Sequence, residues 1–572
     1  MPSARNPFVL LLLALTASSG AQTPALSTPS TVPPVECDLL FAGGRVVDGT
    51  GAPWFRGDVC VKGDRIAAVG ALTGAAATRR VDATRLVIAP GFIDMMGQSE
   101  YRILVDGRAA SKITQGITTE ITGEGSSIAP IDARLLAAGK PTYEHYGYTP
   151  MFTTIDGYFK ELVKRGSAVN VGTFVGAGGL RSLVIGEVDR AATAAELERM
   201  KAHVAQAMEE GALGLSTSLI YVPDHFASTD EIIALAKVAA SYGGSYITHQ
   251  RDEGDDNGGG LDASMDEVMR IAREANIPAE VYHLKASGKR NWGRMKDLLE
   301  RIERARAEGL DVSADQYPWA ASSNNLDASL PFWVREGGAE PMVARLKDPA
   351  QRARARTDFL KMPENADWPA GAARILVTAV LNPALKSLEG QTIEQIAAAA
   401  TKDPIDTIMD IVADDKGNTA RVSFSMSEDD VRTALRSPLV SFCTDSGASA
   451  EDGIFSKQKS HPRAWGSASR ILGYYVRDQK VLSLEEAIRK MTSLPAARMR
   501  LTDRGIVRAG MAADLVAFDP DTVDSRATYA DPLHYSVGMP YVAVNGALVV
   551  DGGVITAARP GRALRGPGYK AK

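Results

Sequence analysis

Two short apolar runs, each ending in a histidine, constrain the fold of this chain more than any other feature. The first covers residues 245–249 and ends at His249, and the second covers residues 279–283 and ends at His283. Between them, residues 261–275 carry apolar side chains at helical spacing. Strand, helix and strand without a hairpin signal predict a right-handed unit with two parallel strands. Such strands lie about 4.8 Å apart and end at one edge, so both imidazoles are expected there.

Metal binding needs neutral imidazole nitrogens held by rigid elements, and two neighbouring strand ends supply them. The alternative is that His249 and His283 are two polar side chains satisfied by protein partners. Either histidine alone favours that alternative, but the pair favours a metal site.

Composition places the chain among large globular proteins. Its 572 residues exceed one domain, and a hydrophobic content of 45% is ample for large cores. A net charge of −5 gives no basic surface, so we expect no nucleic-acid partner.

The first residues resemble a targeting segment rather than part of a fold. Arg5 precedes an apolar block at 8–15, and small residues lead to Ala21. We therefore expect a signal peptide at 1–21, then a Thr/Pro/Ser-rich leader at 22–35. The apolar block is shorter than the roughly 20 residues that a membrane span needs. The protein is expected to be exported, to the periplasm or beyond, with no membrane span after cleavage.

The three cysteines leave two arrangements open. Cys37 and Cys60 lie in neighbouring β-like segments and would pair in an oxidising compartment, or would be two separate buried thiols. Cys443 is then the odd cysteine and is expected to be buried.

Alternating strand and helix patterns predict a TIM (β/α)8 barrel over residues 89–505. The β-rich, glycine-punctuated ends, 36–88 and 506–572, suggest one small β-sandwich built from both termini. The gap before the last barrel strand is too long for one connection, so an inserted, mostly helical subdomain is expected at about 331–426. The eight strand candidates are 87–95, 118–125, 168–177, 211–221, 246–249, 279–285, 311–319 and 439–445.

Barrel active sites lie at the C-terminal ends of the strands, so the polar residues there are the candidates for chemistry. They are Gln98, Glu100, Glu124, Tyr221, His249, His283, Lys285, Tyr317 and Asp445. Two histidines and one carboxylate with an open position fit a hydrolytic metal, which polarises a carbonyl and acidifies a water. Asp445 is suited to take the proton of that water and pass it to the leaving group. Lys285, Tyr317 and Tyr221 suit a substrate carboxylate, whereas a loop cap is the alternative for each strand-end carboxylate.

Several segments, in order, resemble the N-acyl-D-amino-acid deacylase (D-aminoacylase) family of the amidohydrolase superfamily, over residues 38–562. They are Ala89-Pro90-Gly91-Phe92-Ile93-Asp94, Gly211-Ala212-Leu213-Gly214-Leu215-Ser216-Thr217, Thr248-His249-Gln250-Arg251-Asp252-Glu253, His283-Leu284-Lys285-Ala286, Asp315-Gln316-Tyr317-Pro318, Thr444-Asp445-Ser446-Gly447, His461-Pro462-Arg463 and Asp503-Arg504-Gly505. The resemblance implies a barrel with a β-sandwich and a zinc-dependent amide hydrolase site for a small substrate with a carboxylate. It implies that His249 and His283 hold a tightly bound zinc and that Asp445 is the general base. Positions matching Tyr221, Lys285, Tyr317 and Ser323 bind the substrate carboxylate in that family.

The departures from the family pattern are selective. Met96 and Gln98 stand where the family has His-x-His, and a thioether and an amide are poor ligands for a divalent ion. The second metal position is therefore expected to be empty. The bridging cysteine after strand two is replaced, with Glu124 as the expected substitute ligand, and a histidine after strand three is lost within 176–181. Gln98 is also a candidate for altered substrate specificity.

Three functional hypotheses follow. The first is a single-zinc amidohydrolase that cleaves N-acyl amino acids, of D configuration by resemblance, or related small amides. The second keeps the site for a lactonase, a cyclic-amide hydrolase or a small-peptide peptidase. The third is a non-catalytic ligand-binding protein derived from the enzyme. Glu124, His249, His283 and Asp445 are all retained, which favours a working single-metal hydrolase over a decayed one.

Overall fold

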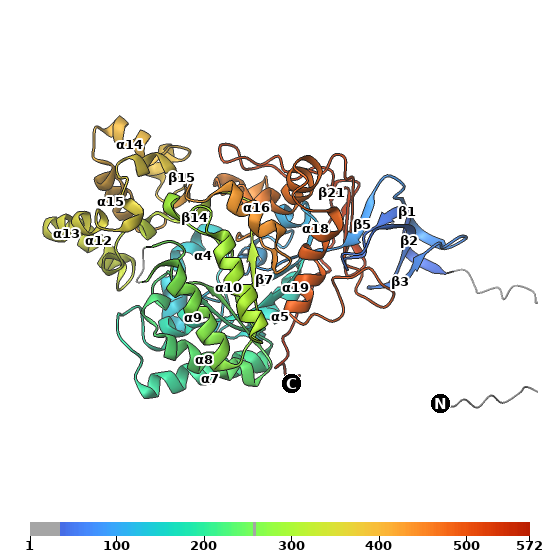
Figure 1. Cartoon of the computed structure of the whole chain (residues 1–572), viewed down its shortest axis with the longest axis horizontal. Helices are drawn as coiled ribbons and strands as arrows, with labels where there is room; N and C mark the ends of the chain where they lie inside the picture. The colour runs from blue at the N-terminus through green and yellow to red at the C-terminus, as the bar shows by residue number, and fades with distance from the viewer. Residues whose placement is uncertain (1–34, 256–258, 572) are drawn as a thin grey trace, which may run out of the picture.

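The computed structural model describes residues 35–255 and 259–571 (Figure 1). The expected signal peptide, 1–21, lies outside the described residues, and so does the leader except for Val35. Within these described ranges, no helix combines the length and the apolar character needed to cross a membrane.

Both ends of the chain contribute strands to one nine-stranded sheet. The join is antiparallel: Ala89 of β5 lies opposite Val516 of β18. The blue and red strands lie side by side in Figure 1. The shared β unit expected from the two termini is therefore present as a sheet, while its description as a two-layer sandwich stays a prediction. The strands are β1 (Glu36–Val46), β2 (Phe55–Lys62), β3 (Arg65–Gly70), β4 (Ala76–Asp82), β5 (Val87–Pro90), β18 (Leu515–Phe518), β19 (Tyr541–Val544), β20 (Ala547–Asp551) and β21 (Val554–Ile555).

The cysteines of this sheet are paired. A disulfide joins Cys37 of β1 to Cys60 of β2, with their Cα atoms 5.4 Å apart. The sequence left a disulfide or two separate thiols open, and the structure contains the disulfide. Cys443 is free and buried, as expected.

The middle of the chain forms a TIM-barrel-type α/β fold from two parallel sheets. One sheet contains β6 (Phe92–Asp94), β7 (Ile117–Thr122) and β8 (Asn170–Thr173). The other contains β9 (Val175–Gly176), β10 (Gly214–Ser218), β11 (Ser245–His249), β12 (Ala279–Val281), β13 (Val312–Gln316) and β17 (Val440–Phe442). Only Phe174 separates β8 from β9. On the other side, Met95 N donates to Phe442 O at 3.1 Å, which links β6 to β17.

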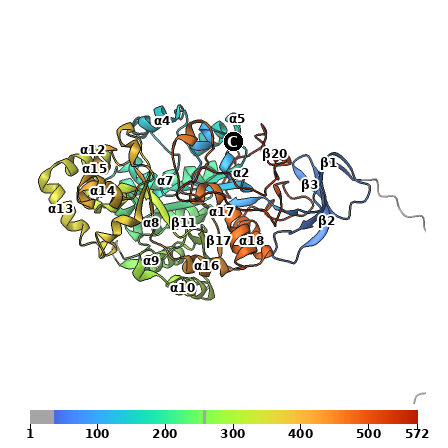
Figure 2. The ribbon, with the colours of Figure 1, turned by 90° about the horizontal axis from the view of Figure 1, so that it is seen from above.

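The strand–helix–strand unit predicted around the two histidines is confirmed. β11 and β12 are parallel, with Thr248 opposite Val281. The helix between them, α9 (Gly260–Ala275), buries residues at the spacing seen in the sequence, among them Met265 and Val268. Figure 2 shows α8 (Thr229–Ser241), α9 and α10 (Met295–Ala307) beside the barrel strands.

The first predicted strand differs from the structure. Residues 87–95 were expected to form one barrel strand, but they form β5 of the terminal sheet and then β6 of the barrel. Gly91 separates the two, and its N–H bonds to Asp514 O at 2.8 Å. A Cβ atom at Gly91 would lie 2.2 Å from Thr118 Oγ1, so only glycine permits this close approach.

The segment between β13 and β17 has a hydrophobic cluster of its own, which includes Leu326, Val377 and Ile408. Its sheet contains β14 (Ser322–Asn325), β15 (Ile375–Ala379) and β16 (Ala420–Ser423), and its longer helices are α12 (Ala339–Lys347), α13 (Pro349–Phe359), α14 (Ile393–Ala400) and α15 (Pro404–Asp414). These helices lie at the end of the molecule opposite the terminal sheet (Figure 1). The expected insertion bounds, 331–426, and the other domain bounds stay predictions; the small sheet already begins at Ser322.

Candidate metal centre

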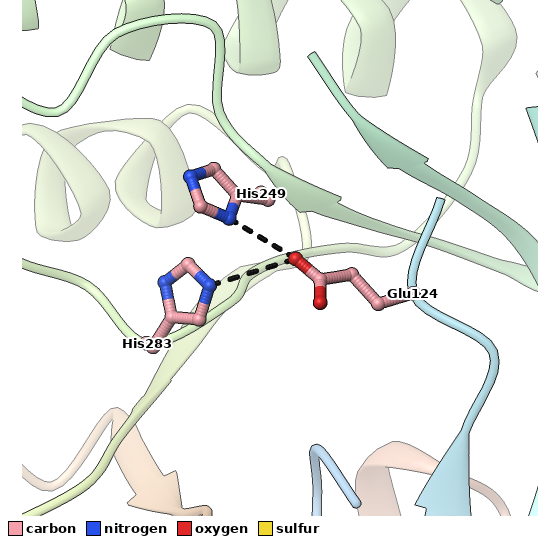
Figure 3. Close-up of side chains that lie close together, drawn as sticks. All are labelled: Glu124, His249 and His283. Carbon is pink, nitrogen blue, oxygen red and sulfur yellow. Dashed lines mark hydrogen bonds and ion pairs between the residues drawn. The ribbon is translucent and has the colours of Figure 1, made fainter. Parts of the chain in front are cut away.

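Three side chains from three strand ends converge in Figure 3. His249 is the last residue of β11, His283 follows β12, and Glu124 follows β7. His249 Nδ1 lies 3.0 Å from Glu124 Oε1, and His283 Nε2 lies 3.8 Å from the same oxygen. One ligand atom from each residue falls within 4.8 Å of the others, and all three side chains are largely buried. The expected ligand set is therefore assembled at one point.

The backbone around these residues is constrained to present them. Glu124 lies between Gly123 (φ 96°) and Gly125 (φ 54°), a left-handed turn that glycine adopts without strain. His283 itself has φ 36°, which is rare for a side-chain-bearing residue. Its N–H donates to Asp315 Oδ1 at 2.7 Å, and this bond stabilises the conformation. Strain held in place by such bonds is typical of functional sites.

A second carboxylate, Glu253, lies behind both imidazoles. Its Oε1 is 3.1 Å from His283 Nδ1 and 3.4 Å from His249 Nε2, although the latter nitrogen makes no hydrogen bond. Lys285 Nζ lies 2.5 Å from that oxygen and 2.6 Å from His283 Nδ1. Burial lowers the pKa of His249, but Glu253 and Glu124 outweigh it and raise that pKa to about 9. Sequence reasoning assigned no role to Glu253, although its place four residues after His249 was a usable signal.

The donor set fits a divalent metal. His249 Nδ1, His283 Nε2 and Glu124 Oε1 are the nitrogen and oxygen donors that Zn²⁺ takes in catalytic sites, where three protein ligands leave a position open. Glu253 contacts the opposite nitrogen of each ring, as the carboxylate partners of metal-binding histidines do.

The candidate base, Asp445, is held by one hydrogen bond and one ion pair. Gln98 Nε2 donates to Asp445 Oδ1 at 3.1 Å and to Glu124 Oε2 at 3.0 Å, so its amide bridges the two carboxylates. Arg463 Nη1 lies 2.6 Å from Asp445 Oδ2. Burial raises the pKa of Asp445, and Arg463 opposes that shift. No role was predicted for Arg463, which belongs to the His461-Pro462-Arg463 segment.

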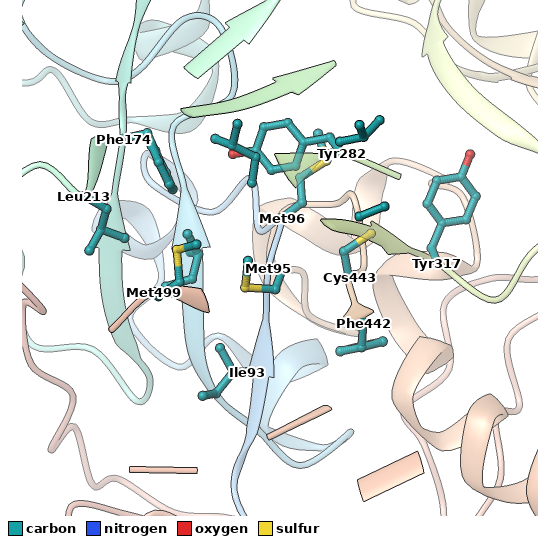
Figure 4. Close-up of a cluster of buried hydrophobic side chains, with 14 of the residues drawn as sticks. Ile93, Met95, Met96, Phe174, Leu213, Tyr282, Tyr317, Phe442, Cys443 and Met499 are labelled. Carbon is teal, nitrogen blue, oxygen red and sulfur yellow. The ribbon is translucent and has the colours of Figure 1, made fainter. Parts of the chain in front are cut away.

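Met96 does not face this centre. It is 1% exposed and packs among buried hydrophobic side chains (Figure 4). Of the two positions where the family has histidine, one therefore belongs to the core and the other, Gln98, bridges two carboxylates.

Four of the five predicted substrate-binding residues line the cavity at the metal centre, and Tyr317 does not. Tyr221, Lys285, Ser323 and Gln98 line one cavity of about 460 Å³ together with the metal-binding candidates and Asp445. The Tyr221 ring is 5.0 Å from the His249 ring, and the Ser323 hydroxyl donates to Arg421 O at 2.8 Å.

Tyr317 is the exception, since it is not among the residues that line this cavity. It is fully buried, and its hydroxyl contacts Met426 Sδ at 3.4 Å. The guanidinium of Arg463 lies 4.8 Å above its ring, so the contacts of Tyr317 are with packing partners and a neighbouring cation. Its role in substrate binding stays a prediction.

Comparison with known proteins places the chain in a family. The model of the amidohydrolase family matches residues 79–550. This protein belongs to the amidohydrolase family. It is 35% identical to D-aminoacylase of Alcaligenes xylosoxydans xylosoxydans, over 92% of this chain and 97% of that protein.

Two solved structures of this amidohydrolase group are also similar. One is a D-aminoacylase whose binuclear metal centre is described as activated by one metal and attenuated by a second (TM-score 0.76, 34% identity, 92% of this chain and 100% of that one). The other is N-acyl-D-glutamate deacylase from Bordetella bronchiseptica with zinc and a phosphonate inhibitor, a mimic of the tetrahedral intermediate (TM-score 0.76, 33% identity, 93% of this chain and 100% of that one). The chain is thus a member of the D-aminoacylase group of amidohydrolases.

Proposed function

We propose that this protein is an exported, single-zinc amidohydrolase that hydrolyses the amide bond of N-acyl amino acids, with D configuration as the first expectation. The observation that carries the proposal is the convergence of Glu124, His249 and His283 beside a held carboxylate, Asp445. The related deacylases support the substrate class. Export rests on the sequence of residues 1–21 alone.

The residues of the chain have separable tasks in this reaction. A divalent metal held by Glu124, His249 and His283 would polarise the scissile carbonyl and acidify a water. Asp445 accepts the proton of that water and returns it to the departing amine nitrogen. Arg463 and Gln98 each bind one oxygen of Asp445, which fixes the direction in which that carboxylate faces.

The position of Gln98 supports a centre that holds one metal ion rather than two. Its two acceptors, Glu124 Oε2 and Asp445 Oδ1, are both carboxylate oxygens, so the amide NH₂ must face them. The amide thus fills the space between two groups that a second cation would need. Met96, buried in the core, supplies no ligand there.

The first experiment is metal analysis of the purified mature protein beside Glu124→Ala, followed by assays on N-acyl-D- and N-acyl-L-amino acids. We expect about one zinc per chain, lost in the variant together with turnover. His249→Ala should lose both as well, and normal turnover in that variant would refute the proposal. Activity confined to lactones, cyclic amides or small peptides would replace the substrate class but keep the site. Ligand binding with no metal and no turnover would favour the binding-protein alternative.

A further inference from the structure

A buried lysine lies beside the loop that carries Asp445. Lys112, from the short helix α2 (Ala110–Ile113), has no exposed surface. Its Nζ atom lies 2.8 Å from Asp94 Oδ2 and 2.7 Å from Glu120 Oε1, and both carboxylates are fully buried as well. Burial lowers the pKa of Lys112, but the two carboxylates outweigh it and raise that pKa, so the ammonium stays charged.

The same ammonium contacts the two residues that flank Asp445. It donates to Thr444 Oγ1 and to Ser446 O, each at 2.7 Å. Asp94 reinforces the first contact, because it accepts from the Thr444 N–H at 2.8 Å and from the Thr444 hydroxyl at 2.5 Å. The three N–H groups of the ammonium are thus shared among four oxygen atoms, and none of them is spare.

The backbone of Asp445 needs this support. Its φ is 49°, in the left-handed region that residues with a side chain rarely adopt. Such a conformation costs free energy and persists only where the surroundings hold it. The Asp445 N–H donates to Met96 O at 2.9 Å, and the Gln98 N–H donates to Ser446 O at 3.1 Å. Lys112 binds that same Ser446 oxygen, so it helps to hold the strained residue in place.

The contacts of Lys112 are confined to the Asp445 side of the centre. Within the part of the chain that the structure describes, its ammonium contacts none of the three metal-binding candidates, Glu124, His249 and His283. Removing the ammonium should therefore displace Asp445 and leave the metal ligands where they are.

We propose that Lys112 is a positioning residue for the candidate base: its buried ammonium holds Thr444 and Ser446 so that Asp445 faces the metal centre. The inference rests on the proposed function, in which Asp445 moves the proton of the attacking water. Reaction geometry is sensitive, since a displacement of about 1 Å can cost about 100-fold in rate. Lys112 thus contributes to turnover without touching substrate or metal.

The first test separates turnover from zinc content. Lys112→Met should lose about 100-fold in kcat on the preferred N-acyl amino acid, with the KM and the zinc content of the wild type. Thr444→Val keeps the ammonium and both carboxylates but removes one of its contacts, and should lose about tenfold in kcat. Loss of zinc from Lys112→Met would overturn the inference, because it would show a general structural role in the site.

Two further variants control for the loss of a buried charge. Lys490 is another buried lysine, and its ammonium binds the carbonyls of Ala434 and Ser437, away from the Asp445 loop. Lys490→Met should therefore keep the kcat of the wild type. If Lys112→Met does not fold, Lys112→Met/Glu120→Gln replaces it, since that variant removes one charge of each sign.

A double-mutant cycle shows whether Lys112 acts through Asp445. In the Asp445→Asn background there is no carboxylate to position. Adding Lys112→Met there should change the residual kcat by no more than about twofold. Equal losses in the two backgrounds would overturn the inference, because Lys112 would then affect the site independently of Asp445.

Hydrogen exchange followed by mass spectrometry tests the inference without turnover. The Asp445 amide is bonded to Met96 O, so a peptide covering 443–450 should exchange slowly in the wild type. Lys112→Met should speed that exchange by about tenfold or more, whereas β11 should exchange as in the wild type. Unchanged exchange in 443–450, or equal acceleration in β11, overturns the inference. Absence of turnover on every substrate overturns the proposed function instead, and the exchange result still decides whether Lys112 holds the Asp445 loop.

Discussion

Replacing Glu253 with glutamine should weaken metal binding although Glu253 is not itself a predicted ligand. Its Oε1 contacts the outer nitrogen of both histidines, at 3.1 and 3.4 Å. Losing a carboxylate behind one metal-bound histidine typically costs about 10- to 100-fold in affinity. Here one carboxylate serves two rings, and its loss leaves the Lys285 ammonium 2.6 Å from His283 without its counter-charge. We therefore expect Glu253→Gln to lose zinc affinity by the upper end of that range, about 100-fold or about 2.7 kcal/mol.

The measurement is competition for zinc between the protein and a chelator of known affinity, at fixed pH. Glu267→Gln is the matched control: it removes a carboxylate bound to Arg251 at 2.9 Å, with no contact to either histidine. Its zinc affinity should equal that of the wild type. A Glu253→Gln variant whose affinity stays within about threefold of the wild type (about 0.6 kcal/mol) would refute the role of Glu253.

Three further predictions concern separate features. Excess zinc should not inhibit the wild type, whereas Gln98→His, which adds a nitrogen donor between two carboxylates, should bind a second zinc by mass spectrometry and lose activity in excess zinc. Burial lowers the pKa of Lys490 from 10.5 to about 7 in the folded protein. Between pH 7 and pH 10.5 the Lys490 amine is therefore charged in the unfolded chain and neutral in the folded one. The free energy of unfolding should rise from pH 7 to 10.5 by up to about 5 kcal/mol, and denaturant titrations of Lys490→Met should lack that rise. Cys37→Ser opens a 23-residue loop and should cost about 3 kcal/mol in the same titrations; a cost no greater than that of Cys443→Ser would contradict it.

Sequence alone located the barrel strands and the metal-binding candidates because both depend on local patterns. The parallel strands are short segments separated by helical patterns, and His249 and His283 follow two of them in one unit, so topology alone predicts their proximity. Glu124 followed from its place after β7.

The features that sequence missed depend on contacts between distant segments. The hydrogen bond from Gln98 to Asp445 joins residues 347 positions apart, and the ion pair between Arg463 and Asp445 depends on how the loops after β17 return to the barrel. The burial of Tyr317 depends on packing against Met426, from the segment between β13 and β17. The split of the first strand depends on Gly91 meeting Thr118, which no periodicity reveals.

The nine-stranded sheet has a consequence for how the protein is made. β5 needs β18 as its neighbour, and the two strands are separated by more than 400 residues of chain. During synthesis, the N-terminal strands emerge long before their partner, so β5 presents an open edge until the ribosome has almost finished. A chain truncated before Leu515 would keep that edge permanently. Such fragments should aggregate rather than accumulate as a folded barrel.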